Sequence, residues 1–154
     1  MHTLPQPLSG KTFFASVKIH PDDTDVLDAF HLDSDHIAVL PAQCTTLMQN
    51  TYFTADRDSR KAECLAQSDA ITPDQIPDVD CGLYHLAGLL YGDFPNELIP
   101  ALSKKGKVSA DIQGFLRHNE NGLMNFHDWK DKLTYLPYLI SSKPMRQKPR
   151  SSPV

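Results

Sequence analysis

Apolar residues in the middle of the chain switch between short continuous runs and helical spacing, a pattern typical of alternating strands and helices. Two apolar runs, 83–90 and 108–112, flank a segment, 98–102, in which leucine and isoleucine recur at helical spacing. Strands joined through a helix are almost always parallel, with a right-handed crossover. We therefore predict a strand–helix–strand unit in which the loops 88–92 and 111–114 lie at the same edge of a sheet, where open α/β sheets bind their ligands.

The start of this helix is expected to be irregular. Asp93 and Pro95 form a helix-opening pair, because aspartate accepts hydrogen bonds from a first turn and proline is tolerated there. Pro100 lies further inside, where a proline removes a hydrogen bond and costs ~3 kcal/mol. The sequence therefore predicts a bend or a late helix start.

Short apolar or β-branched runs, separated by polar and proline-containing turns, fill the rest of the chain. Strands are predicted at 12–19, 37–40, 45–54, 122–126 and from 138 on, helices at 21–31 and 128–136, and a capped helical turn at 72–77. Residues 61–65 fit either a strand or a helix. Pattern alone leaves two interpretations of residues 37–67, an edge hairpin or a small sheet over the ligand edge, and favours the hairpin.

The chain has 154 residues, enough for one domain that buries on the order of 70% of its unfolded surface. Its charge is uneven, because residues 1–142 hold all 19 acidic and 11 of the 15 basic residues, a net charge of −8. An acidic body argues against a nucleic-acid partner, since such binding depends on neutralising phosphates. The last twelve residues are basic and rich in proline and serine, which predicts a disordered tail.

Three cysteines, Cys44, Cys64 and Cys81, lie too far apart for a zinc-binding pair, and their odd number argues against a disulfide framework. Reduced thiols favour a cytoplasmic location. The first residues lack the apolar core of a signal peptide, and no apolar run reaches the length of a membrane span. The sequence therefore predicts a soluble protein with no membrane partner.

A candidate binding site follows the second strand of the central unit. Asp111, Gln113 and Arg117 surround Gly114, and a carboxylate, an amide and a guanidinium around a glycine loop can hold a polyhydroxylated or phosphorylated ligand. The alternative is structural: Asp111 caps its loop and Arg117 pairs with an acidic residue on the surface. Both interpretations are compatible with the residue types.

Other chemistry has less support. The chain has no serine-nucleophile elbow, no phosphate-binding loop of the GxxxxGK type and no dinucleotide-binding GxGxxG. Histidines lie beside carboxylates at 20–23 and 33–36, but neither group offers the converging ligands that a metal needs. We therefore assign no catalytic residue and no metal ligand.

Four strings of this sequence resemble the ribokinase / phosphofructokinase-B (PfkB) family of carbohydrate kinases. They are TTLMQNTYFTADRDSR (45–60), YHLAGLLYGDFPNELIPALSKKG (84–106), VSADIQGFLR (108–117) and LPYLISSK (136–143). The resemblance covers residues 11–143, which would form a partial kinase-like domain. It leaves an unstructured start, 1–10, and a disordered basic tail, 144–154.

The resemblance implies an α/β fold, a partial ribokinase-like parallel sheet in which a small β lid, about 37–67, covers the sugar site. This overturns the preference for an edge hairpin. It also implies phosphorylation of a sugar hydroxyl with ATP and Mg²⁺. The positions that map near the substrate or phosphates are Gly88, Asp111 and Gln113, and the positions that map to the lid are Thr46 and Tyr52.

Three parts of the family pattern do not occur in these 154 residues: a glycine-rich first segment, an N-x-x-E motif and the GxGD motif that carries the general base. Phosphoryl transfer depends on positioning and electrostatics, so we expect a truncated kinase that is inactive by itself. The alternatives are a sugar-binding or kinase-interaction module, or the product of a broken reading frame. The partners implied are a sugar-like molecule, the missing kinase half, or a second copy bound through the lid sheet.

Overall fold

The structure is a computed structural model of the chain. It describes residues 12–30, 32–53, 55 and 59–142. The predictions for the first ten residues and for the basic tail therefore lie outside the described residues. No helix in the described ranges is long and apolar enough to cross a membrane.

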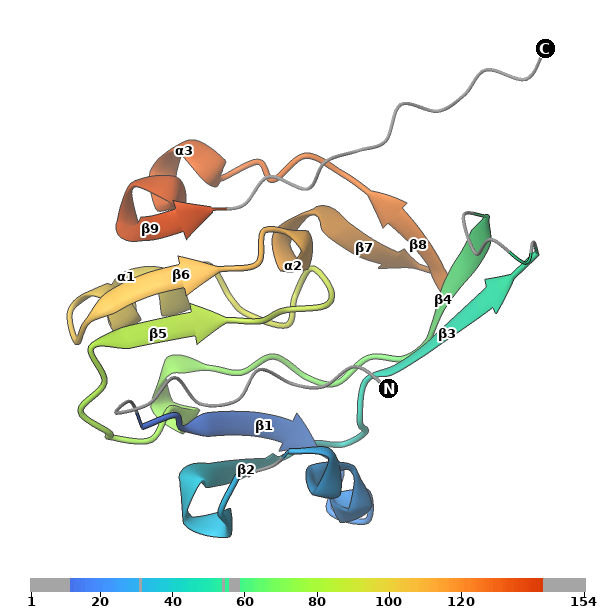
Figure 1. Cartoon of the computed structure of the whole chain (residues 1–154). Helices are drawn as coiled ribbons and strands as arrows, with labels where there is room; N and C mark the ends of the chain where they lie inside the picture. Colours follow the sequence, from blue (N-terminus) through green and yellow to red (C-terminus); the bar gives the residue numbers. More distant parts are fainter. Residues whose placement is uncertain (1–11, 31, 54, 56–58, 143–154) are drawn as a thin grey trace.

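Two parallel sheets run in the same direction (Figure 1). In the first, β1 (Ala15–Ile19) pairs with β2 (Ile37–Pro41). The second has the order β5-β6-β9, with bounds Leu83–Leu86, Lys107–Ala110 and Leu139–Ser142. The predicted strand–helix–strand unit is confirmed, since β5 and β6 are parallel neighbours and the helix α1 lies between them in the sequence.

A small antiparallel sheet stands at one end of these strands (Figure 1). Its order is β3-β4-β8-β7, with bounds Leu47–Tyr52, Arg60–Ala66, Leu123–Phe126 and Arg117–Glu120. The range of about 37–67 expected for the lid therefore begins too early, although its end agrees with β4. The run 37–41 pairs with β1 instead, and two strands from much later in the chain complete the small sheet, a long-range pairing that local patterns do not report.

The helices are short. The α-helices are α1 (Leu98–Ser103), α2 (Gln113–Leu116) and α3 (Lys132–Tyr135), and the 3₁₀ helices are η1 (Thr24–Ala29), η2 (Ser34–His36), η3 (Pro73–Gln75) and η4 (Leu136–Tyr138). The late helix start is confirmed, because α1 begins at Leu98. Pro100 is thus its third residue, where a backbone N–H has no partner within the helix, so proline is tolerated.

The helix predicted at 21–31 differs from the structure. Only 24–29 is helical, in the 3₁₀ form, and none of its residues is buried. Val26 is 39% exposed, so the apolar face that predicted the helix does not pack into the core. Leu27 and Phe30 of that face are only half-buried, and a short 3₁₀ turn forms because the little burial available does not stabilise a longer α-helix.

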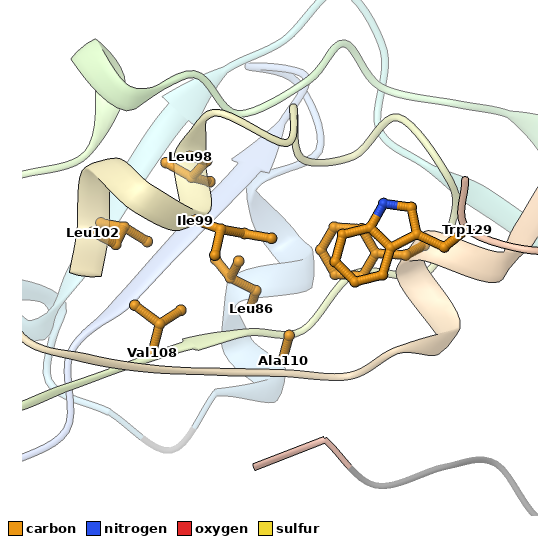
Figure 2. Packing of buried hydrophobic residues seen from close by; sticks show 8 residues of the cluster. Leu86, Leu98, Ile99, Leu102, Val108, Ala110 and Trp129 are labelled. Atoms are coloured by element: carbon orange, nitrogen blue, oxygen red, sulfur yellow. The ribbon is translucent and has the colours of Figure 1, made fainter. Parts of the chain in front are cut away.

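The core lies between α1 and the strands β5 and β6. Leu98, Ile99 and Leu102 of α1 project toward Leu86, Val108 and Ala110, as Figure 2 shows. Trp129 closes one end of this cluster: it is 2% exposed and stacks on Phe115 at 4.4 Å between ring centroids. Its indole N–H donates to the Oδ1 atom of Asn96 at 3.2 Å, which satisfies the one polar atom it buries. The packing fixes β5 and β6 side by side, and so fixes the loops that follow them.

Candidate functional site

Two glycines bring the loops after β5 and β6 into backbone contact. A Cβ atom on Gly114 would lie 2.8 Å from the Cα of Gly88, and a Cβ on Gly88 would lie 3.2 Å from the Cα of Gly114. Real Cβ atoms essentially never lie 2.8 Å from a backbone atom, so the contact requires glycine at position 114. A Cβ on Gly88 would also lie 2.9 Å from the Phe94 ring, so position 88 is tightly packed as well. The prediction that the two loops share one edge of the sheet is confirmed.

Asp111 stands directly after β6 at this edge. Its N–H donates to the Leu86 carbonyl at 2.9 Å, and its Oδ1 accepts from the Gln113 N–H at 3.0 Å. This Asx turn starts α2 and is the capping role that the structural alternative foresaw. The carboxylate remains exposed, and its other lone pairs are available to a ligand.

Asp93 shapes the neighbouring loop rather than opening the helix. Its Oδ2 accepts from the N–H groups of Leu89 and Leu90 at 2.8 and 2.9 Å. The Gln67 amide donates to the Tyr91 carbonyl at 3.0 Å from the other side. The helix-opening role predicted for Asp93 is therefore wrong, because α1 begins five residues later and this carboxylate instead holds the loop that contains Gly88.

Arg117 is the first residue of β7, and its carbonyl accepts from the Tyr91 N–H at 2.6 Å. Its guanidinium lies 5.7 Å from the ring centroid of Phe126 on β8. Burial lowers the pKa of Arg117, the nearby cation Arg60 lowers it further, and the Asp111 carboxylate raises it. The side chain thus lies half-buried between a cation and an anion, and within the described ranges no carboxylate comes within ion-pair distance of it.

The strand that carries Arg117 was missed in the sequence analysis, because its residues, RHNE, have no apolar alternation. An available signal lay just beyond it. Asn121 and Gly122 both have positive φ, 54° and 87°, and an Asn-Gly pair is the strongest short signal of a two-residue hairpin. The turn places β7 beside β8, and this pairing carries Arg117 to the sheet edge.

His118, the next residue, points to the opposite face of β7. Its ring stacks on Tyr91 at 4.2 Å and meets His127 edge-on at 4.8 Å. Burial, followed by the charge of His127, lowers the pKa of His118. The stack joins the loop after β5 to the small sheet, so the two parts of the site are held together.

The two predicted lid residues lie at opposite ends of β3. The Thr46 hydroxyl accepts from the Ser68 N–H at 3.0 Å, at the base of the β3–β4 hairpin, whereas Tyr52 pairs with Arg60 at its far end. Six residues of strand span about 20 Å, so one sugar-sized ligand cannot touch both. The structure thus brings together Gly88, Asp111 and Gln113, but not the whole predicted set.

A search of the described residues for metal ligands gives one cluster, Asp33, Asp35 and His36. It lies in and beside η2, which precedes β2, and hence at the amino-terminal end of the parallel strands. Asp111 lies at their carboxyl end. Among the described residues, no group of three or more such ligands lies beside Asp111.

Comparison with solved structures agrees with this geometry, whereas two other comparisons find no match. No protein-family model matches the chain, and neither does any curated protein. A sulfate complex of a pyrophosphate-dependent kinase in the ribokinase family is 29% identical with a TM-score of 0.73, and the match covers 84% of this chain and 46% of that one. Such a kinase complexed with a pyrophosphate analog and myo-inositol is 30% identical with a TM-score of 0.69, over 83% and 45%.

A third structure, a pyrophosphate-dependent myo-inositol-1 kinase converted into a myo-inositol-3 kinase, is 26% identical with a TM-score of 0.68, over 83% of this chain and 44% of that one. The chain thus spans slightly less than half the length of the kinases it matches. Their folds confirm the α/β ribokinase-like architecture and the resemblance that the sequence strings predicted. Over the part of the fold that it spans, this chain resembles kinases of the ribokinase family.

Proposed function

We propose that this chain forms the substrate-binding part of a ribokinase-type phosphotransferase and binds a sugar or cyclic polyol at the carboxyl edge of its parallel sheet. The observation that carries the proposal is the backbone contact of Gly88 with Gly114, which places the Asp111 carboxylate and the Gln113 amide beside the small sheet. The myo-inositol complex of one structural neighbour supports a polyol as the ligand.

The residue types fit such a ligand. The exposed Asp111 carboxylate accepts hydrogen bonds from hydroxyl groups, and the Gln113 amide both donates and accepts. Each hydroxyl of a polyol is itself a donor and an acceptor, so a carboxylate beside an amide can orient two adjacent hydroxyls. Gly88 itself is buried against Gly114 and Phe94, so its contribution is to hold the two loops together beneath these polar groups.

The phosphoryl donor is a separate question. The sequence resemblance implies ATP with Mg²⁺, whereas the three structural neighbours described above are pyrophosphate-dependent kinases. Neither the GxGD motif nor a described cluster of metal ligands lies beside Asp111 in this chain. We therefore propose that the 154 residues alone bind the acceptor substrate without transferring phosphate.

Calorimetric titration with myo-inositol, glucose and ribose tests the binding proposal. Asp111→Asn should weaken binding of the preferred polyol roughly tenfold, since it replaces a charged acceptor by a neutral amide. Asp80→Asn is the matched control, because Asp80 is exposed before β5, at the opposite end of the same strands. Equal affinities for the two variants, or no binding by the unmodified chain, would contradict the proposal.

A second candidate role has one observation in its favour. Leu65 and Leu123 lie on the face of the small sheet opposite to Arg117 and are 57% and 47% exposed. Exposed apolar side chains on a sheet face favour pairing with another surface, so this face is suited to a second copy or to another part of a kinase. Sedimentation of the chain and of Leu65→Glu tests it, since the substitution should dissociate any dimer formed through this face.

A further inference from the structure

The segment that follows β4 wraps around Asp93. Gln67, the first residue after β4, donates from its side-chain amide to the Oδ1 atom of Asp93 at 3.3 Å and to the Tyr91 carbonyl at 3.0 Å. Four residues further on, the Ile71 N–H donates to the Asp93 carbonyl at 2.9 Å. Asp93 is therefore held at its carboxylate and at its backbone by the two ends of one segment, 67–71.

Asp93 connects this segment to the loop after β5. Its Oδ2 atom accepts from the N–H groups of Leu89 and Leu90, the two residues that follow Gly88. Leu90 is fully buried, and a Cβ on Gly114 would lie 2.8 Å from Gly88. A continuous chain of contacts thus leads from the end of β4 to the glycine contact that joins the loops after β5 and β6.

The same segment is also fixed to the first parallel sheet. The ammonium of Lys18 on β1, whose side chain is only 4% exposed, donates to the Ala70 carbonyl at 2.7 Å. The segment is therefore where three sheets meet: the first parallel sheet through Lys18, the small sheet through Gln67, and the second parallel sheet through Asp93. Because these side chains are at least half-buried, their hydrogen bonds are stronger than bonds in water and couple the small sheet to the loop after β5.

We infer that Gln67 and Asp93 are positioning residues for the proposed polyol site. They act through residues 88–90 on the places of Asp111 and Gln113 rather than through contact with the ligand. A binding site needs its polar groups held to within about 0.5 Å, and glycine at a loop contact does not restrict the backbone by itself. The inference rests on the proposed function and adds to it the residues that give the site its shape.

Changing the donors of Gln67 tests the inference. The probe is whichever of myo-inositol, glucose and ribose the unmodified chain binds most tightly in calorimetric titration. Gln67→Glu should weaken binding about tenfold, since its carboxylate would face the Asp93 carboxylate and the Tyr91 carbonyl, and Gln67→Ala about threefold, since it only removes the donors. Gln49→Glu is the matched control, because it adds the same charge to the same sheet at an exposed position on β3.

A reciprocal exchange separates positioning from a general loss of stability. In Asp93→Asn the one remaining oxygen can still accept from Leu89 and Leu90, but the new amide nitrogen faces the Gln67 amide, so two donors oppose each other. Adding Gln67→Glu places an acceptor opposite that nitrogen. The double variant should therefore bind more tightly than either single variant and within about threefold of the unmodified chain, whereas independent losses would add.

Amide hydrogen exchange gives a readout that needs no ligand. In Gln67→Ala, the N–H groups of Leu89 and Leu90 should exchange about threefold faster or more, because the Asp93 carboxylate that holds them has lost a donor. Exchange at Val108, in the buried part of β6, should not change. If Gln67→Glu does not fold, Gln67→Ala and this exchange measurement carry the test.

Three results would overturn the inference. If every Gln67 variant binds as tightly as the unmodified chain while Asp111→Asn weakens binding, the polyol site stands and the positioning role is wrong. If the double variant binds more weakly than both single variants, the substitutions act through general stability. If the unmodified chain binds none of the three probes, the proposed function fails and the inference fails with it.

Discussion

The contact between Gly88 and Gly114 gives the sharpest prediction about stability. In Gly114→Ala, the new Cβ would lie 2.8 Å from the Cα of Gly88 and 3.0 Å from both its carbonyl carbon and oxygen. All three atoms are backbone, so no side-chain rotation relieves the clash, and the loops after β5 and β6 must separate. Such overpacking costs about 1–3 kcal/mol.

A second effect opposes this cost. Gly114 lies in the first turn of α2, and alanine is favoured over glycine in a helix by at most ~1 kcal/mol. The net loss of unfolding free energy is therefore expected to be about 1–2 kcal/mol. With a urea m-value on the order of 2 kcal/mol/M, the unfolding midpoint should fall by roughly 0.5–1 M.

Gly82→Ala is the matched control for this prediction. A Cβ on Gly82 meets no atom within 4 Å, so the substitution should be neutral or stabilise by about 0.4–1 kcal/mol through the unfolded chain. Urea unfolding followed by the fluorescence of Trp129 measures both variants, since this is the one tryptophan of the chain. If Gly114→Ala is as stable as Gly82→Ala, the loops are not in backbone contact and the site as described is wrong.

Three further predictions follow from other parts of the fold. Trp129→Ala should lower the unfolding free energy by about 3–5 kcal/mol in urea titrations, because it empties the end of the core, whereas Trp129→Phe keeps the stack on Phe115 and should cost less. A hydrogen bond from Lys18 lowers the pKa of the Asp69 carboxyl below 3.8. The ionised carboxylate therefore stabilises the fold above that pH, and this stabilisation is lost as the pH falls further. Urea midpoints measured between pH 5 and 2 should show the loss, and the midpoints of Asp69→Asn should fall less over the same range. Burial lowers the pKa of His118 below 6.5, so protonation of this side chain destabilises the fold as the pH falls below that value. An NMR titration should give His118 a low pKa. In His118→Phe, this part of the pH dependence of the unfolding free energy should disappear.

Local patterns in the sequence were sufficient for the central unit. Leu98, Ile99 and Leu102 recur at helical spacing because they fill one buried face of α1. Val108 and Ala110 alternate with less buried residues because one face of β6 packs against that helix. The parallel pairing and the shared edge then follow from chain connectivity. The positions of Asp111 and Gln113 at that edge were predictable for the same reason.

Local patterns were insufficient wherever a distant segment decides the structure. The hairpin of β3 and β4 was predictable in part, but β7 and β8 join it across about sixty residues, and nothing within 45–66 reports that pairing. For the same reason the pairing of Arg117 with Phe126 could not be foreseen, since these residues come from different strands. The helix predicted around Val26 shows the converse error, because a segment with helical spacing that buries none of its residues forms only a 3₁₀ turn.

The central claim, that this part of a ribokinase-type fold binds a polyol at the carboxyl edge of its parallel sheet, is tested most directly by mapping where a polyol binds. Amide NMR spectra of the isotope-labelled chain, titrated with myo-inositol, would give that map. The account predicts shifts at Gly88, Asp111, Gln113 and Gly114. Shifts confined to the opposite edge around Asp80 and Gly106, or none at saturating ligand, would contradict it.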